Sequence, residues 1–485
     1  MEGILPRHDG SSKEPGGGRR CAHRPAGFGD SVLAGIGAPR GNGGARLANG
    51  GFVHGIMRGS LALPLLLMVL QGAEPAGATS PDRTLKAALP RLVVIRHRIH
   101  ANPELGFREK ETAAAIEEYL AGLGITEIER GVAQTGVVAV IRGGLPGPVV
   151  AVRADMDALP VTEETGFSFS STKRDTYEGQ DVGVAHACGH DIHVTSLLGV
   201  AAVLSGFGEE LPGTVKLIFQ PAEEGPPPGV TDGALQMIEQ GVLENPAPEA
   251  IFGLHISPGM DVGEAGYTIG AAMAAVDRFT ARIIGRSAHG AAPEAAVDPI
   301  VMGAQAVTAL QTIRSRNLSP LEPSVITVGI FRGGSRYNII PGEVLLEGTV
   351  RTYDPGVQDT IERRMNEILD GITTAGGGSY ELSYRRVNPA LVNEPALGAR
   401  SVEALRGALG AENVRAVDPL MPGEDFAFFS SKIPGFYFHL GARAAGTASG
   451  GLHTPDMRAD DGAIEAGVRA MTAVILDYLG HGKDR

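Results

Sequence analysis

The chain has 485 residues, of which 43% are hydrophobic and 20% charged, a composition that is ordinary for globular proteins. The length suggests about two or three domains, and the composition argues against a fully disordered chain or a polytopic membrane protein. The net charge of −13 argues against nucleic-acid binding, because phosphate binding needs a basic surface. The two cysteines, Cys21 and Cys188, are too few for a disulfide framework.

The N-terminal residues do not have the pattern of a folded domain. Residues 1–56 are rich in glycine and arginine and lack apolar periodicity, so we expect a disordered segment or a misassigned extension upstream of Met57. Residues 57–78 have a basic start, a short apolar stretch and a final Ala-Gly-Ala, the layout of a secretory signal peptide. The alternatives are an uncleaved apolar anchor or a chance run of leucines. The signal-peptide hypothesis predicts a periplasmic or extracellular protein that begins near Thr79 and has no stable membrane insertion.

Helical and strand periodicities alternate through the next part of the chain. We expect helices at 80–101, 109–123, 193–204 (capped by Asp191) and 232–241, and strands at 137–142, 149–153, 214–220 and 251–256. A turn rich in glycine and proline separates the first two strands, which is typical of a β-hairpin. The alternation predicts a mostly parallel sheet with helices on both faces.

The order of elements changes near residue 274. We expect a strand at 276–284, a helix at 298–314, strands at 324–331 and 343–353, a helix at 357–373 and a strand at 380–385. This βαββαβ order is that of a ferredoxin-like domain. Two helices, at 394–409 and 462–479, and a strand at 435–440 then complete the first domain. We therefore predict an α/β fold with a discontinuous larger domain of residues 79–272 and 380–485, into which a second domain of residues 273–379 is inserted.

Polar residues follow three predicted strands of the larger domain. Asp155 and Asp157 follow the second strand, Glu223 and Glu224 follow the third, and His255 lies at the end of the fourth. Ligands of open α/β sheets bind beyond the carboxyl ends of the strands, so we expect these side chains to converge.

Two further clusters contain residues that can bind metal ions. Cys188 and His190 lie at the start of a helix, and His453 lies in a turn near the C-terminus. Thiolate, imidazole and carboxylate groups are ligands of zinc-like ions. A metal would also protect the lone thiol of an exported protein from oxidation. Each residue alone has a structural explanation, such as a buried histidine or a small core cysteine, so the hypothesis rests on all of them together.

These motifs resemble those of the M20 metallopeptidases, in the branch of hippurate hydrolases, N-acyl-amino-acid amidohydrolases and auxin-conjugate hydrolases. The resemblance covers about residues 88–479. The motifs that carry it are HANPELGF (100–107), DMDALP (155–160), HACGHD (186–191), PAEEG (221–225), GLH (253–255), EDF (424–426) and LH (452–453).

The resemblance implies two divalent metal ions per subunit, Zn²⁺ or Mn²⁺, with Co²⁺ and Ni²⁺ also compatible. The implied ligands are Cys188, His190, Glu224, His255 and His453. Glu223 would be the general base for a metal-activated water. Asp155 and Asp157 would orient a ligand imidazole.

The inserted domain contains GRSAHG (285–290) and NIIP (338–341), which resemble motifs of the family's lid and dimerisation domain. There, His289 and Asn338 would bind the substrate or its oxyanion. The resemblance thus implies a homodimeric amidohydrolase that cleaves N-acyl amino acids. The alternatives are an aminopeptidase or dipeptidase, or an inactive binding protein on the same fold.

Overall fold

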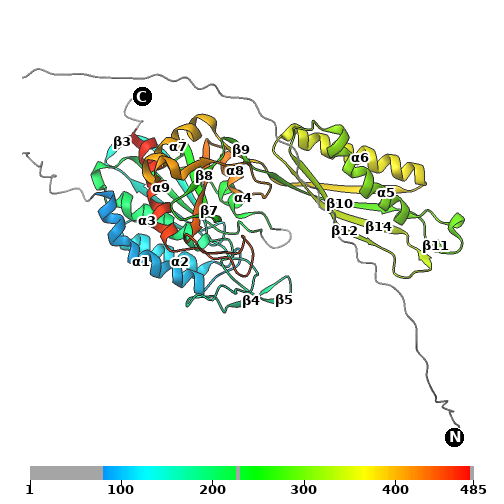
Figure 1. Ribbon diagram of the computed structural model, residues 1–485, viewed down its shortest axis with the longest axis horizontal. Helices are drawn as coiled ribbons and strands as arrows, with labels where there is room; N and C mark the ends of the chain where they lie inside the picture. The colour runs from blue at the N-terminus through cyan, green and yellow to red at the C-terminus, as the bar shows by residue number, and fades with distance from the viewer. Residues whose placement is uncertain (1–79, 226–229, 481–485) are drawn as a thin grey trace, which may run out of the picture. The chain divides into compact units, whose positions relative to one another are not determined.

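A computed structural model describes residues 80–225 and 230–480 (Figure 1). The expected signal peptide and the segment before it lie outside the described residues. Within the described ranges, no helix is both long enough and apolar enough to cross a membrane.

The larger domain contains an eight-stranded sheet of order β1-β2-β6-β3-β7-β18-β8-β17. Its four central strands, β6, β3, β7 and β18, are parallel to one another, as predicted. The strands are β1 (Glu127–Val132), β2 (Gly136–Arg142), β3 (Leu145–Asp155), β6 (Pro212–Gln220), β7 (Ala250–Asp261), β8 (Ala265–Tyr267), β17 (Val414–Ala416) and β18 (Gly435–Arg443).

Helices cover both faces of this sheet because its central strands are apolar on both sides (Figure 1). Val150 and Val152 of β3 pack into the core beneath α1, α2, α3, α7 and α9, whereas Ala151 packs into the opposite core beneath α4 and α8. The helices are α1 (Pro81–Ala101), α2 (Lys110–Gly122), α3 (His190–Ser205), α4 (Gly233–Glu239), α7 (Pro395–Leu409), α8 (Phe426–Ser430) and α9 (Gly462–Gly480).

The predicted hairpin between β2 and β3 is wrong. Strand β6 lies between them, antiparallel to β2 and parallel to β3. The connecting glycines contact the start of β6 instead, because Gly143 N–H donates to the Gly213 carbonyl at 2.9 Å. A turn-rich connection therefore did not imply direct pairing of the two strands.

The smaller domain is a four-stranded antiparallel sheet of order β12-β14-β10-β15 with two helices. Its elements are β10 (Ala275–Ile284), α5 (Pro299–Thr312), β12 (Ser324–Gly333), β14 (Glu343–Thr352), α6 (Pro355–Gly376) and β15 (Ser379–Asn388), in the predicted βαββαβ order. Burial alternates along β10: Phe279, Ala281 and Ile283 face the helices, whereas Arg278 and Arg282 are exposed on the other face.

The predicted boundary at residue 379 divides this sheet incorrectly. Strand β15 pairs with β10 along most of its length, so the smaller domain continues to Asn388. Three two-stranded sheets complete the described strands: β4 (Arg174–Tyr177) with β5 (Gln180–Gly183), β9 (Gly270–Met273) with β16 (Leu391–Asn393), and β11 (Ala288–His289) with β13 (Ile339–Ile340).

Candidate metal centre

The five predicted ligands lie in one continuous cluster. The ligand atoms of Cys188, His190 and His255 all lie within 4.8 Å of one another, as do those of Cys188, Glu224 and His453. A further group joins His190, Glu224 and Glu223. The cluster therefore brings together four separate stretches of chain: the turn after β6, the middle of β7, the start of α3 and the C-terminal turn that carries His453.

Cys188 and His255 face each other with their ligand atoms free to share a cation. The Cys188 Sγ lies 3.3 Å from the His255 Nε2, and the His255 Nδ1 lies 2.7 Å from the Ile256 carbonyl oxygen. Donation from Nδ1 to that carbonyl leaves the Nε2 lone pair facing the thiol. Burial and the carboxylate of Glu224 raise the pKa of the Cys188 thiol well above its usual range, so its ionisation requires a nearby cation.

Glu224 connects the two other histidines of the cluster. Its Oε1 lies 3.3 Å from the His453 Nε2 and 3.7 Å from the His190 Nε2. The buried His190 Nε2 and Glu224 Oε1 have no hydrogen-bond partner within the described ranges. Burying such atoms without partners is unfavourable, and a bound cation would satisfy both. The backbone N–H of His453 donates to the Ala187 carbonyl at 2.8 Å, which attaches the C-terminal turn to the Cys188 loop.

Asp157 orients the turn that carries the two glutamates. Its Oδ1 and Oδ2 accept hydrogen bonds of 3.1 Å from the backbone N–H groups of Glu223 and Glu224, respectively. The same Oδ1 lies 3.3 Å from the His190 Nδ1. One buried carboxylate therefore contacts both the glutamate turn and a ligand imidazole.

Asp155 contacts a histidine that the sequence analysis did not identify. The His193 Nδ1 donates to the Asp155 Oδ1 at 2.5 Å, and the His193 Nε2 accepts from the Ile256 N–H at 2.9 Å. His193 thereby connects β3 to the residue after His255. The available indication was its spacing of three residues from His190 on α3, which places both rings on one helix face.

Arg153 was also missed, although it lies two residues before Asp155. Its guanidinium pairs with three buried carboxylates, at 2.6 Å to Asp155, 3.0 Å to Glu424 and 2.7 Å to Asp425. An arginine inside an otherwise apolar, buried strand was the available indication, because buried charges are rare unless they are paired.

Glu223 lies beside the cluster, partly buried, with its carboxylate within 4.8 Å of those of Glu424 and Asp425. Burial and the charge of Glu424 raise its pKa well above the usual range. A carboxyl group with a raised pKa binds a proton readily, as a general base must during turnover.

The prediction that Asp191 caps α3 is wrong. Gly189 occupies the N-cap position, with φ +88°, and Asp191 lies in the first turn. The Asp191 carboxylate accepts from the Arg96 Nε and lies within hydrogen-bond distance of the His100 Nδ1, both at 2.9 Å. A second ion-pair network therefore attaches α1 to the start of α3.

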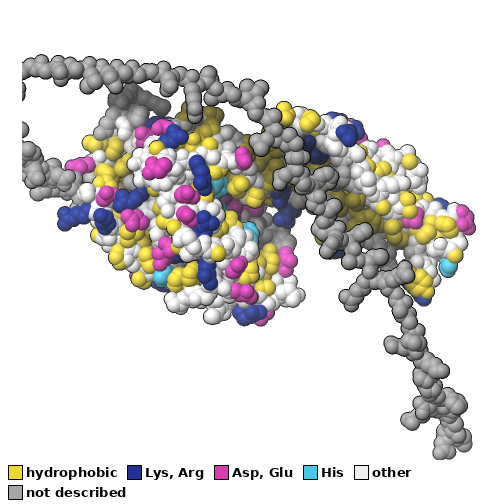
Figure 2. Space-filling view, in the orientation of Figure 1, with side chains coloured by type: hydrophobic (Ala, Val, Ile, Leu, Met, Phe, Trp, Pro, Cys, Tyr) yellow, Lys and Arg dark blue, Asp and Glu magenta, His cyan; other side chains and the backbone are white. Residues whose placement is uncertain are grey.

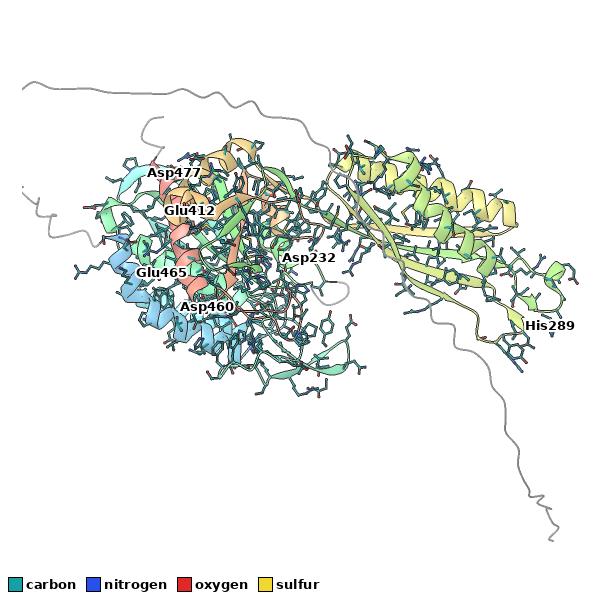
Figure 3. The ribbon with its side chains drawn as sticks, in the orientation of Figure 1. Asp232, His289, Glu412, Asp460, Glu465 and Asp477 are labelled. Carbon is teal, nitrogen blue, oxygen red and sulfur yellow. The ribbon has the colours of Figure 1, made fainter. Side chains whose placement is uncertain are left out.

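His289 and Asn338 lie together in the smaller domain and not at the cluster. His289 pairs with Ile339 between β11 and β13, and the Gly290 N–H donates to the Asn338 carbonyl at 2.8 Å. Figure 3 shows the exposed His289 at the tip of the smaller domain. Neither residue lines the pocket described next.

A pocket of about 400 Å³ opens beside the cluster, a volume suited to a small-molecule ligand. Cys188, Glu223, Glu224, His255 and His453 line one part of it. Its apolar wall is formed by Ile256, Met260, Met273, Val276, Val417, Leu420 and Leu452. On the visible face of the larger domain, acidic and basic side chains are interspersed (Figure 2).

The thiol, three imidazoles and a carboxylate of the cluster are metal-binding groups, and the glutamate and apolar pocket beside them are what a metal-dependent hydrolase requires. Residues 151–477 match the model of peptidase family M20/M25/M40, and the chain belongs to this family. The chain is 41% identical to the N-acyl-L-amino acid amidohydrolase of Geobacillus stearothermophilus over 319 residues, 65% of this chain and 82% of that protein. It is 39% identical to the N-acetyl-L-cysteine deacetylase of Bacillus subtilis over 353 residues, 72% of this chain and 80% of that protein.

Solved structures agree with this assignment. The crystal structure of the Bacillus subtilis YXEP protein, described as a dinuclear metal binding peptidase from the M20 family, superposes with a TM-score of 0.68 at 33% identity. The match covers 81% of this chain and 99% of that one. The fold and the chemical class of the enzyme, a metal-dependent amide hydrolase, are thereby confirmed.

Proposed function

We propose that this protein hydrolyses the amide bond of N-acyl amino acids, with Glu223 as the general base. The observation that carries the proposal is the position of the Glu223 carboxylate beside the cluster of potential ligands and at the wall of the pocket. The names of the amidohydrolase and deacetylase relatives support this substrate class.

Cys188, His190, Glu224, His255 and His453 would hold two divalent ions, Zn²⁺ or Mn²⁺, and their donor types suit either metal. Such ions supply Lewis acidity, which polarises a carbonyl group and lowers the pKa of water.

The side chains of the chain supply proton transfer and positioning. The Glu223 carboxylate takes a proton from water as the water attacks the amide carbon, and returns it to the departing nitrogen. Asp157 fixes Glu223 through the backbone hydrogen bond described above. The apolar wall of the pocket excludes water from one side of the substrate and accommodates an apolar group.

The test is a panel of N-acyl amino acids and dipeptides, assayed with metal-stripped protein and with protein reloaded with Zn²⁺ or Mn²⁺. We expect Glu223→Gln to lower kcat by about 10²–10⁴-fold with metal content unchanged. Glu412→Gln, a change of the same kind at an exposed glutamate (Figure 3), is the matched control. Full activity of Glu223→Gln would exclude the base assignment, and turnover of dipeptides alone would favour a peptidase.

We further propose that the smaller domain forms a homodimer, through which His289 and Asn338 reach the substrate of the partner subunit. Exposed apolar side chains on this domain support the proposal, including Leu321 at 90% and Tyr337 at 95% exposure. The test mixes two inactive proteins, His289→Ala and Glu223→Gln, under conditions of subunit exchange. Mixed dimers would regain one intact site each, and a mixture as inactive as its parents would exclude a shared site.

Export by the segment at 57–78 is a separate proposal, supported by its basic, apolar and Ala-Gly-Ala layout. N-terminal sequencing of secreted protein should begin near Thr79. Recovery of the full-length chain from the cytosol alone would exclude export.

A further inference from the structure

One arginine stands out among the residues that line the pocket. Arg278, the fourth residue of β10, is the one lysine or arginine among the described lining residues. Its side chain is exposed and makes no hydrogen bond or ion pair within residues 80–225 and 230–480. A free guanidinium at the wall of a ligand pocket is available to bind an anion.

The neighbours of Arg278 on the sheet are not complementary to its charge. Arg278 lies directly opposite Arg385 on β15 and Thr349 on β14. Arg385 also has no hydrogen-bond or ion-pair partner in the described part of the chain. Like charges that face each other across two strands are destabilising, so the pair carries positive charge that the sheet itself does not neutralise.

Arg282, on the same strand and the same face, provides the contrast. It lies opposite Glu381 on β15 and pairs with it at 2.5 Å, and it pairs at 2.6 Å with Glu343 of β14, a diagonal neighbour. Thus the arginine remote from the pocket is flanked by acids on both sides, whereas the arginine at the pocket is flanked by another arginine.

An irregularity in strand pairing lies beside Arg278, at the start of β10. The β10–β15 register shifts between Val276 and Asp277, which is a β-bulge. Bulges change the direction of nearby side chains and often lie next to active sites. Val276 and its partner Asn388 both line the pocket, so the bulge lies at its wall.

Asp232 is an acidic side chain that interacts electrostatically with both arginines. It lines the pocket at the N-cap of α4 and is labelled in Figure 3. Burial raises its pKa, while Arg385 and Arg278 lower it, so the three charges are within electrostatic reach without forming an ion pair. Asp232 therefore reduces the positive potential of the pair but leaves the Arg278 guanidinium free.

We propose that Arg278, with Arg385 beside it, binds the free carboxylate of the substrate's amino acid portion. The inference rests on the proposed function and narrows it. The substrate would carry a carboxylate at one end and an apolar group against the wall of Met260, Val417 and Leu420. N-acyl amino acids with a free carboxylate fit this description, whereas their amides and esters lack the anion.

The experiment compares N-acetyl-L-phenylalanine with its carboxamide, using metal-loaded wild-type enzyme, Arg278→Gln, Arg278→Lys and Arg282→Gln. Charge-assisted hydrogen bonds are strong, so we expect Arg278→Gln to lower kcat/KM for the acid by about 10- to 100-fold, mainly through KM. The carboxamide should change by less than about threefold, Arg278→Lys should retain part of the preference, and Arg282→Gln should behave like wild type.

Two further measurements separate binding from folding and from turnover. In a Glu223→Gln background, calorimetric titration should show weaker binding of the acid when Arg278 is also changed to Gln. Arg278→Gln removes a repulsive pair, so its Tm should equal or exceed that of the wild type. Asp232→Asn should have the opposite effect to Arg278→Gln and lower KM for the acid.

The outcomes distinguish this inference from the proposed function. Equal losses of acid and carboxamide hydrolysis in Arg278→Gln, or a wild type without preference for the acid, would overturn the carboxylate site and leave the hydrolase intact. A preference for N-succinyl-L-phenylalaninamide over the N-acetyl acid would overturn it too, because the anion would then lie on the acyl side. A wild type that cleaves no N-acyl substrate would overturn both proposals.

Discussion

The double role of Asp157 gives a sharp prediction about metal affinity. Each of its carboxylate oxygens accepts one backbone N–H, from Glu223 and from Glu224, and Oδ1 also faces the His190 Nδ1. In Asp157→Asn one carboxylate oxygen becomes an NH₂ group, which is a donor and cannot accept the backbone N–H that this oxygen accepted. The loss of one hydrogen bond to a charged group costs about 1.5–3 kcal/mol. At about 1.4 kcal/mol per factor of ten, metal binding should weaken by about 10- to 150-fold.

The assay is a competition titration of Zn²⁺ between the protein and a chromophoric chelator. Asp181→Asn, the same chemical change in the exposed β5 strand, is the control and should bind like wild type. Asparagine and aspartate have almost the same size and shape, so both variants should keep the wild-type circular dichroism spectrum. An Asp157→Asn protein with Zn²⁺ affinity within about twofold of wild type would refute the positioning role.

Three further predictions concern stability. Burial lowers the pKa of His100, but two carboxylates outweigh it and raise the pKa to about 9. The stability that His100 contributes, about 3 kcal/mol, is therefore complete below pH 6.5 and is lost as the pH rises from about 6.5 through about 9. Thermal melting should show that His100→Gln flattens this decline, and an unchanged slope would contradict it. Arg153→Met leaves buried carboxylates without their cation and should cost about 3–5 kcal/mol in urea unfolding, whereas a loss below about 1 kcal/mol would argue against the network. Gly189→Ala puts a Cβ 2.4 Å from the Ile256 Cγ1 at φ +88°, and it should lower the free energy of unfolding by about 2–4 kcal/mol in the same assay. Wild-type stability would contradict this prediction.

The sequence contained enough information to place the candidate ligands near one another. Glu224 and His255 follow apolar runs of strand length in β6 and β7, and both strands are parallel to β3, so both residues lie beyond the part of these strands that pairs with β3, at one edge of the sheet. The spacing of Cys188 and His190 placed both at the start of a helix, which the structure bears out for His190 as the first residue of α3. These inferences depend only on local periodicity and on one rule of parallel sheets.

The interactions that depend on distant partners could not be predicted in this way. Asp191 has the residue type and position of a helix cap, but its carboxylate contacts Arg96 and His100, about ninety residues earlier in the chain. The insertion of β6 between β2 and β3 likewise depends on packing across the sheet, because periodicity gives strands without their neighbours. The same limit applies to the smaller domain, whose last strand was recognised but assigned to the wrong side of the boundary.

The distribution of buried charge explains why Arg153 belongs to the site as much as the candidate ligands do. One guanidinium contacts Asp155, Glu424 and Asp425, so the network beneath the pocket holds more buried acid than base. Two backbone N–H groups donate to the Asp157 carboxylate and stabilise part of its negative charge. Uncompensated buried charge costs several kcal/mol, so the remaining excess favours a cation nearby. The thiol and imidazole groups converge on the side of the network that faces the pocket. Asp155 at the end of β3 and the two acids directly before α8 therefore contribute negative potential that a divalent ion would neutralise. Removal of Arg153 would make that potential more negative and would also destabilise the fold around the three carboxylates. Metal affinity should therefore rise while stability falls.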